Sequence, residues 1–148
     1  MKNAILFSLT LLCAFQLSAQ TQYAVVTTIE SIIPAGLGRS RMISNKEDLN
    51  TANFTTTRTD GIKSNMGDVK RKDLKIDNFD ETKLLNFYSL GGINFQNVAS
   101  NDAIVSAKLN EMSAAGWELA FVTSGVESDG GTTDGEGIFT TRYIFKRN

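Results

Sequence analysis

The last third of the chain constrains the fold most, because a helical pattern there ends at a glycine and two strand patterns follow. Apolar residues recur at i, i+4, i+7 and i+11 from Val105 to Gly116, the spacing of one helical face. Gly116 stands where a left-handed residue often ends a helix. Such an end would let the chain reverse and bring Trp117 onto a sheet. Residues 119–126 and 138–146 carry the Phe, Val, Ile and Tyr typical of strands. This order predicts a helix packed on an antiparallel hairpin.

The start of this helix is predicted at Ala103. Ser100, Asn101 and Asp102 precede it, and all three carry side chains that cap helix N-termini. Further upstream, residues 84–90 fit a buried strand and a short amphipathic helix equally well. Periodicity does not separate these two alternatives.

The first half of the chain predicts one long strand and a polar insertion. Residues 23–33 are apolar on both faces of a strand, which indicates a central position in a sheet. Pro34 ends the strand, and residues 39–43 form a short returning strand. Residues 44–80 are rich in Asn, Thr, Asp and Lys without a sustained apolar period, so they are interpreted as a long insertion. Within it, a small hairpin about Asp60-Gly61 and partial disorder are both compatible with the composition.

Together these elements predict the α+β class. The expected architecture is a two-layer sandwich, in which a small, mainly antiparallel sheet has one main amphipathic helix packed on one face. Residues 20–148 are predicted to form a single domain, with the polar, partly flexible insertion at about 44–80.

The N-terminal 19 residues have the pattern of a secretory signal peptide. Lys2 is followed by an apolar run over residues 4–15, and Ala19 is a small residue at the expected cleavage position. The run is shorter than the roughly 20 residues that a membrane helix needs, so no membrane span is predicted. A lipid anchor on Cys13 is the competing interpretation, which the bulky Leu12 before it disfavours. The mature chain is therefore expected to be exported, either to the periplasm or as a secreted protein.

The residue types that the predicted mature chain lacks restrict the chemistry that it can perform. Cys13 is the only cysteine and the sequence has no histidine. Removal of residues 1–19 would exclude disulfides, thiolate nucleophiles, thiolate metal sites and a Ser-His-Asp triad. Without Lys2, 14 basic residues stand against 16 acidic ones, a net charge of −2. No dense basic patch with interleaved aromatics appears, so a nucleic-acid partner is not predicted. We assign no catalytic residue, metal ligand or cofactor.

Several motifs of this chain resemble the small bacterial family called domain of unknown function 4177. The resemblance covers about residues 22–30 and 101–147 and implies the topology of a helix followed by a C-terminal hairpin. The chain would be an exported, Bacteroidetes-like member with a long insertion. The family has no assigned activity, so the resemblance implies none. The motifs that carry it are Tyr23-Ala24-Val25-Val26, Leu109-Asn110-Glu111, Gly116-Trp117-Glu118-Leu119 and Tyr143-Ile144-Phe145-Lys146-Arg147.

The best candidate binding site is a turn rich in glycine and arginine after the first strand. Its glycines allow successive N–H groups to point into one concavity, and two guanidiniums flanking a hydroxyl can clamp a phosphate, sulfate or carboxylate. The alternative is an ordinary turn with solvated arginines, which is favoured because nucleotide fingerprints need further glycines and a following helix. The residues of this predicted anion loop are Gly36, Gly38, Arg39, Ser40 and Arg41.

Three further groups of residues are weaker candidates. A loop with Asp129, Asp134 and Glu136 offers oxygen ligands for calcium, but its spacing does not fit an EF-hand. Glu111 and Glu118 are a conceivable carboxylate pair whose separation nothing in the sequence fixes. The aromatic residues near the C-terminus are assigned to the core rather than to a ligand groove. They are Trp117, Phe121, Phe139, Tyr143 and Phe145.

The sequence therefore favours a non-enzymatic binding or interaction module of the cell envelope. Its partner is expected to be another envelope protein, a second copy bound through an exposed sheet edge, or a small anionic ligand. The polar insertion is the preferred place for recognition, because loops vary without unfolding a scaffold. The alternative is a small carboxylate- or metal-dependent hydrolase or lyase with the insertion as a lid. That alternative needs carboxylates converging in a closed pocket.

Overall fold

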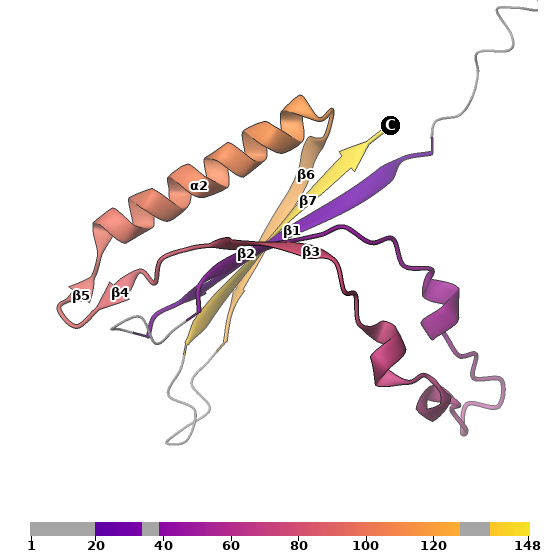
Figure 1. Ribbon diagram of the computed structural model, residues 1–148. Helices are drawn as coiled ribbons and strands as arrows, with labels where there is room; N and C mark the ends of the chain where they lie inside the picture. The colour runs from indigo at the N-terminus through magenta and orange to yellow at the C-terminus, as the bar shows by residue number, and fades with distance from the viewer. Residues whose placement is uncertain (1–19, 34–38, 128–136) are drawn as a thin grey trace, which may run out of the picture.

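The computed structural model describes residues 20–33, 39–127 and 137–148, so the predicted signal peptide lies outside the described residues. Helix α2 (Phe95–Ala114) crosses one face of an antiparallel five-stranded sheet (Figure 1). The predicted α+β fold is confirmed. In the described part of the chain, no helix has the length and apolar character to cross a membrane. The strand order is β3-β2-β1-β7-β6, with β1 (Gln22–Ser31), β2 (Arg41–Asn45), β3 (Phe79–Lys83), β6 (Glu118–Val126) and β7 (Ile138–Arg147).

Strand β1 is central, as its two apolar faces predicted. It pairs with β2 on one side and with β7 on the other, in register from Gln22 opposite Arg147 to Ser31 opposite Ile138. Successive side chains of a strand point to opposite faces. Val26 therefore faces the helix and is buried, whereas Val25 lies on the face that we call the open face, away from the helix.

The core lies between α2 and the sheet. Val26, Met42, Leu84 and Phe145 are its buried apolar residues. Helix residues Ile104, Leu109 and Met112 pack against them, together with Trp117 and Tyr143 from the sheet side. Leu109 and Met112 belong to the predicted apolar stripe of the helix.

Helix α2 ends as predicted. Gly116 has a φ of 82°, in the left-handed region that favours glycine. The Gly116 N–H donates to the Ser113 carbonyl at 2.9 Å, and the Trp117 N–H donates to the Met112 carbonyl at 3.0 Å. This pair of bonds is a Schellman motif, which satisfies carbonyls that the helix end leaves free. It directs the chain into β6.

The predicted start of the helix is wrong. Asn94 is the N-cap, because its side chain accepts a hydrogen bond from the Asn97 N–H at 3.2 Å, and the helix begins at Phe95. Asn101 therefore lies within the helix, where it is 2% exposed. Its amide makes tertiary contacts instead of capping.

The segment that fitted both helix and strand is neither over residues 84–87. It is an irregular stretch, followed by a small hairpin of β4 (Tyr88–Ser89) and β5 (Gly92–Ile93). The Asn101 side chain hydrogen-bonds this stretch in the way that the backbone of a neighbouring strand would. Its Oδ1 accepts from the Leu85 N–H at 2.8 Å, and its Nδ2 donates to the Leu85 carbonyl at 2.7 Å and to Glu30 Oε1 at 2.8 Å. A side-chain amide therefore replaces the ladder of a neighbouring strand.

Residues 46–78, which we call the arm, project away from the sheet (Figure 1). Glu47 closes the base of the arm, because its Oε1 accepts from the Asn78 N–H at 2.8 Å and from Asn78 Nδ2 at 2.6 Å. The arm lies within the predicted insertion, but that insertion also covered the start of β3, whose polar sequence gave no strand signal. Three 3₁₀ turns without buried residues occur along the arm: η2 (Thr51–Phe54), η3 (Met66–Asp68) and η4 (Arg71–Leu74).

The suggested hairpin about Asp60-Gly61 is wrong. The Asp60 carboxylate accepts from the N–H groups of Ile62 and Lys63, each at 3.0 Å, and no strand flanks the turn. These hydrogen bonds lower the pKa of Asp60, that from Lys63 most. A local side-chain turn has taken the place of strand pairing.

Candidate functional site

The predicted anion loop is only partly described, since Gly36 and Gly38 fall outside the described residues. Ser40 is buried. Its hydroxyl accepts from the Ser31 N–H at 3.0 Å and donates to Asn86 Oδ1 at 2.8 Å. This hydroxyl joins β1 to the stretch before β4, so it has a structural role here.

The two arginines of the loop differ in their surroundings. Arg39 is exposed, whereas Arg41 is half-buried and its Nη1 donates to the Ser40 carbonyl at 2.8 Å. Both guanidiniums retain further donors, since each carries five N–H groups. An anion site at this turn stays a prediction. Within the loop, the Ser40 hydroxyl is already hydrogen-bonded to Ser31 and Asn86.

The remaining weak candidates do not come together. Asp129, Asp134 and Glu136 lie outside the described residues. Glu111 pairs with Lys108 at 2.7 Å, and Glu118 pairs separately with Lys146 at 3.4 Å. Both carboxylates are mostly exposed, so these ion pairs contribute little stability.

A groove of about 360 Å³ runs between α2 and the β2–β3 edge of the sheet. Asp80 and Glu111 line it, but Asp80 bonds to Lys46 at 2.7 Å and Glu111 to Lys108 at 2.7 Å. Each carboxylate thus has a lysine partner and contact with solvent. Among the described residues, no group of three or more His, Cys, Asp or Glu is placed to hold a metal ion. This groove differs from the closed carboxylate pocket that the hydrolase alternative needs.

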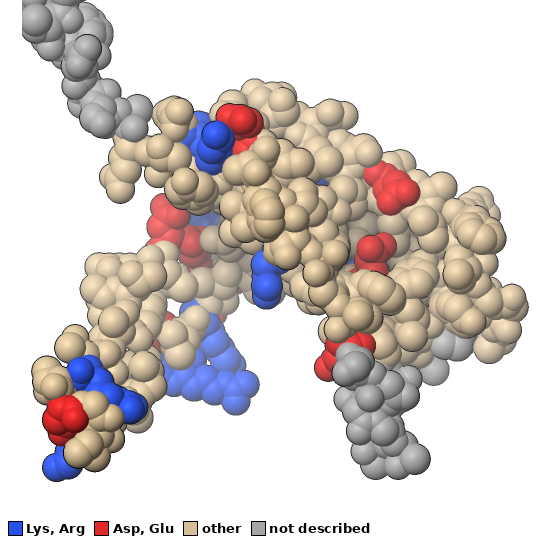
Figure 2. Space-filling view, turned by 180° about the vertical axis from the view of Figure 1, so that it is seen from behind, with Lys and Arg blue, Asp and Glu red and all other residues tan. Residues whose placement is uncertain are grey.

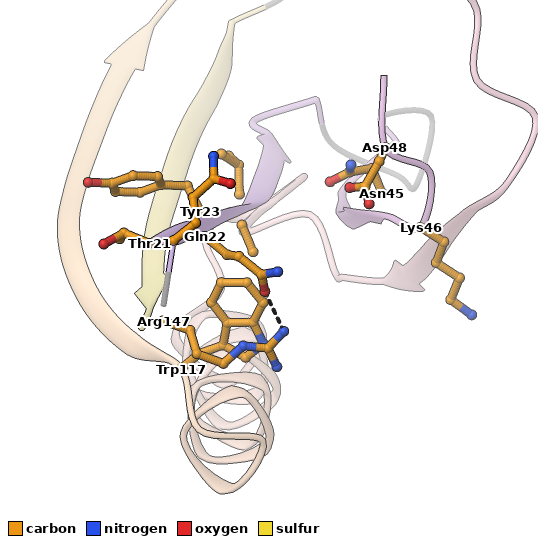
Figure 3. Close-up of a pocket in the computed structure, with 11 residues that line it drawn as sticks. Thr21, Gln22, Tyr23, Asn45, Lys46, Asp48, Trp117 and Arg147 are labelled. Atoms are coloured by element: carbon orange, nitrogen blue, oxygen red, sulfur yellow. Dashed lines mark hydrogen bonds between the residues drawn. The ribbon is translucent and has the colours of Figure 1, made fainter. Parts of the chain in front are cut away.

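A polar pocket of about 660 Å³ lies at the end of the sheet where Gln22 and Arg147 pair (Figure 3). The Arg147 guanidinium lies 4.3 Å from the centre of the Trp117 ring, and its Nη2 donates to Gln22 Oε1 at 2.6 Å. Lys46 also lines the pocket but points away from Arg147 toward its ion pair with Asp80. A stacked guanidinium with free donors is able to bind a carboxylate or phosphate. The guanidinium also covers one face of the Trp117 ring, and this contact alone is enough to explain its position.

The C-terminal aromatics divide between core and surface. Phe145 is 1% exposed, and Trp117 and Tyr143 pack against the core, as predicted. Burial raises the pKa of Tyr143, and the charges of Glu30 and Asp102 add to this, whereas a hydrogen bond with Thr28 acts in the opposite direction. The remaining two depart from the prediction: Phe121 is 62% exposed, and the 40%-exposed Phe139 meets Phe87 edge-on at 5.4 Å between ring centres.

The largest departure from the predicted core is strand β6. All nine of its residues are exposed, including Phe121, which was predicted to lie in the core. Leu119 and Val122 are 42% and 43% exposed, and Phe121 and Val126 are both 62% exposed. Its only charged residue, Glu118, stands at the first position and is paired with Lys146. β6 is therefore an apolar strand at the edge of the sheet.

The opposite edge has a different character. β3 has five residues, of which Asp80, Glu81 and Lys83 are charged. Short length and charged side chains are the devices by which natural sheets prevent an edge from pairing with another chain. β3 carries both devices, whereas β6 has nine residues, one charge at its first position and one register shift, between Leu119 and Phe121.

The apolar surface of β6 continues onto the open face of the sheet. Phe121 is paired with Ile144 of β7, which in turn is paired with Val25 of β1. Tyr23 extends the same face and is 68% exposed. Charged side chains are sparse over much of the body in Figure 2, where Lys and Arg gather instead on the arm. Contiguous exposed apolar surface of this kind marks interaction sites in soluble proteins.

Comparison with known proteins gives no match, since no family model, curated protein or solved structure corresponds to this chain. The resemblance to the domain of unknown function 4177 stays a prediction.

Proposed function

We propose that this protein is a non-enzymatic binding module of the cell envelope, whose partner docks on strand β6 and the adjoining open face. The observation that carries the proposal is the asymmetry of the two sheet edges. β3 is short and charged, whereas β6 is long, apolar and exposed over its whole length. An edge strand of the second kind is a template for another strand, because one side of its backbone has no ladder partner among the described residues.

The open face supports the same conclusion. Tyr23 and Phe121 are large, mostly exposed aromatics on the uncovered side of the sheet. Aromatic residues are enriched at protein interfaces because they bury much apolar area at a low entropic cost. A strand added at β6 would extend the sheet and bring its own side chains beside Phe121.

Placement in the envelope rests on the predicted signal peptide of residues 1–19.

The arm is a second candidate surface, because apolar Ile62 and Met66 are exposed among its charged residues. The anion site at Arg39 and Arg41 stays a separate prediction and does not affect the role proposed for β6.

Photo-crosslinking in the producing bacterium tests this proposal. We expect that Phe121→benzoylphenylalanine forms an adduct on irradiation, because this side chain would lie inside the interface. The same replacement at Leu90, which is 87% exposed in the hairpin turn between β4 and β5, is the matched control and should form none. Adding Val122→Lys to the labelled protein should remove the adduct, because a lysine would be desolvated in an apolar interface.

The adduct is read by mass spectrometry. A discrete added mass at position 121 that is absent at position 90 is the expected result, whether that mass is a second copy or another protein. No adduct at position 121, or equal adducts at both positions, would contradict the proposed function.

A further inference from the structure

We propose that the partner of β6 is β6 of a second copy, paired antiparallel about a two-fold axis through Thr123. This inference rests on the proposed function and names the partner of the same surface. It follows from a self-complementary pattern of side chains in β6, from an open space beside Gly125 and from the distribution of charge along the strand.

The pattern consists of a large residue and a glycine at equal distances from Thr123. Phe121, Thr123 and Gly125 are paired with Ile144, Arg142 and Thr140, three alternate residues of β7. All three therefore lie on the open face, since alternate residues of a strand share a face. Antiparallel pairing about Thr123 would place Phe121 of each copy opposite Gly125 of the other.

The space beside Gly125 can receive the ring. A Cβ atom added at Gly125 would meet no atom of the described residues within 4 Å, so none of these residues covers this glycine. Phe121 is 62% exposed, so most of its ring is uncovered in the single chain and is accessible to a facing strand. An aromatic side chain across from a glycine is a known stabilising pair in sheets. The two Thr123 residues would face each other at the axis, which is also a favourable cross-strand pair.

The face toward the helix is compatible with the same register. Val122 and Ser124 are paired with Tyr143 and Thr141 of β7 and share that face. Pairing about Thr123 would set Val122 of each copy opposite Ser124 of the other. Neither pair sets two large side chains or two charges against each other, so the register fits on both faces of the sheet.

Charge is also compatible with self-pairing. Glu118 is the only charged residue of β6, and Lys146 already pairs with it. In an antiparallel arrangement the two Glu118 residues would lie at opposite ends of the joint ladder. Self-pairing of β3 about its central residue, in contrast, would set the two Glu81 carboxylates opposite each other.

The symmetry of the pattern favours a second copy over a foreign strand. In a two-fold interface every contact occurs twice. Phe121 of each copy would therefore fill the space beside Gly125 of the other copy. A foreign strand would reproduce both contacts only if it carried a glycine and an aromatic at the matching positions. β6 carries both already, at equal distances from Thr123.

A single cysteine at the axis tests the inference. Cys13 lies in the predicted signal peptide and is the only cysteine, so residues 20–148 with Thr123→Cys carry one thiol. Directly opposed residues of antiparallel strands have Cα atoms about 4.5–5.5 Å apart, within the range of about 4.4–6.8 Å that a disulfide needs. We expect a disulfide-linked dimer under mild oxidation. Thr82→Cys, at the exposed β3 edge, is the matched control and should remain largely monomeric.

Sedimentation of the cysteine-free chain gives a second readout. Wild-type residues 20–148 should show a concentration-dependent monomer–dimer equilibrium. Gly125→Lys should raise its dissociation constant by about tenfold or more, because it fills the space for Phe121 and desolvates a charge. Gly67→Lys in the arm, where an added Cβ also meets no atom within 4 Å, should leave the constant unchanged.

A chain that sediments as a monomer at all concentrations, or equal crosslinking of the two cysteine variants, would overturn the second-copy inference. The photo-crosslinking experiment separates this failure from failure of the proposed function. An adduct of Phe121→benzoylphenylalanine with a different protein would overturn self-pairing and retain the binding module, whereas no adduct would overturn both.

Discussion

Asn101→Ala is expected to lower the free energy of unfolding by about 3–5 kcal/mol. The side chain is 2% exposed and satisfies both the N–H and the carbonyl of Leu85, together with the Glu30 carboxylate. Alanine would leave two backbone groups and one carboxylate without these partners. Each buried polar group that loses its hydrogen bond costs about 1–3 kcal/mol. Because domains of this size are stable by only about 5–15 kcal/mol, the loss would be a large share of the total.

Urea unfolding followed by circular dichroism measures this effect. Asn110→Ala is the matched control, because Asn110 lies in the same helix but is exposed. Alanine is the better helix former there, so the control should change the free energy by less than about 0.5 kcal/mol. A loss below about 1 kcal/mol for Asn101→Ala would contradict a stabilising role for the hydrogen bonds of this side chain.

Phe145→Ala is expected to cost about 3–5 kcal/mol of unfolding free energy. Phe145 is 1% exposed and stands between Ala24 of β1 and Leu119 of β6, on the face that packs against the helix. Its removal would open a cavity in a core where the described residues include three other buried apolar ones, namely Val26, Met42 and Leu84. So few neighbours offer little apolar volume to refill the space.

Phe121→Ala is the control for this prediction, since it deletes the same ring from the exposed strand β6. Measured at a concentration below self-association, it should cost less than about 1 kcal/mol, because little of the ring is buried in the single chain. Equal losses for the two variants would contradict the division of the C-terminal aromatics between core and surface.

The parts of the fold that local signals determine were predictable. Gly116 ends the helix because the left-handed conformation needs little else than a glycine at that position. The central position of β1 was also predictable, since it follows from apolar residues on both faces of one segment. Both signals lie within a few neighbouring residues and do not depend on what the chain later packs against.

The helix start and the stretch at residues 84–87 were not predictable in this way. Asn94 and Asn101 carry the same amide, and both are suitable caps by residue type. Tertiary structure assigns Asn94 to the cap and Asn101 to Leu85, which is 16 residues away in sequence. β3 escaped prediction because a polar edge strand takes its conformation from pairing with β2 rather than from apolar alternation.

The candidate surface was hidden for a related reason. The sequence of β6 is apolar like that of a central strand, and only the strand order shows that it lies at an edge. Exposed edges were expected as a possible place for self-association, but not on this strand. The predicted loop at Arg39 and Arg41 followed from residue types alone, and burial of Ser40 depends on its tertiary partner Asn86.

Amide hydrogen exchange of residues 20–148 at increasing protein concentration tests the central claim about β6 most directly. In the described part of the single chain, no strand pairs with the outer side of the β6 backbone, so its outward amides should exchange rapidly. With increasing concentration, amides of residues 121–125 should become protected, whereas those of β3 should not change. Concentration-independent exchange in β6, or protection that appears only in β3, would contradict the pairing of β6 with a second copy.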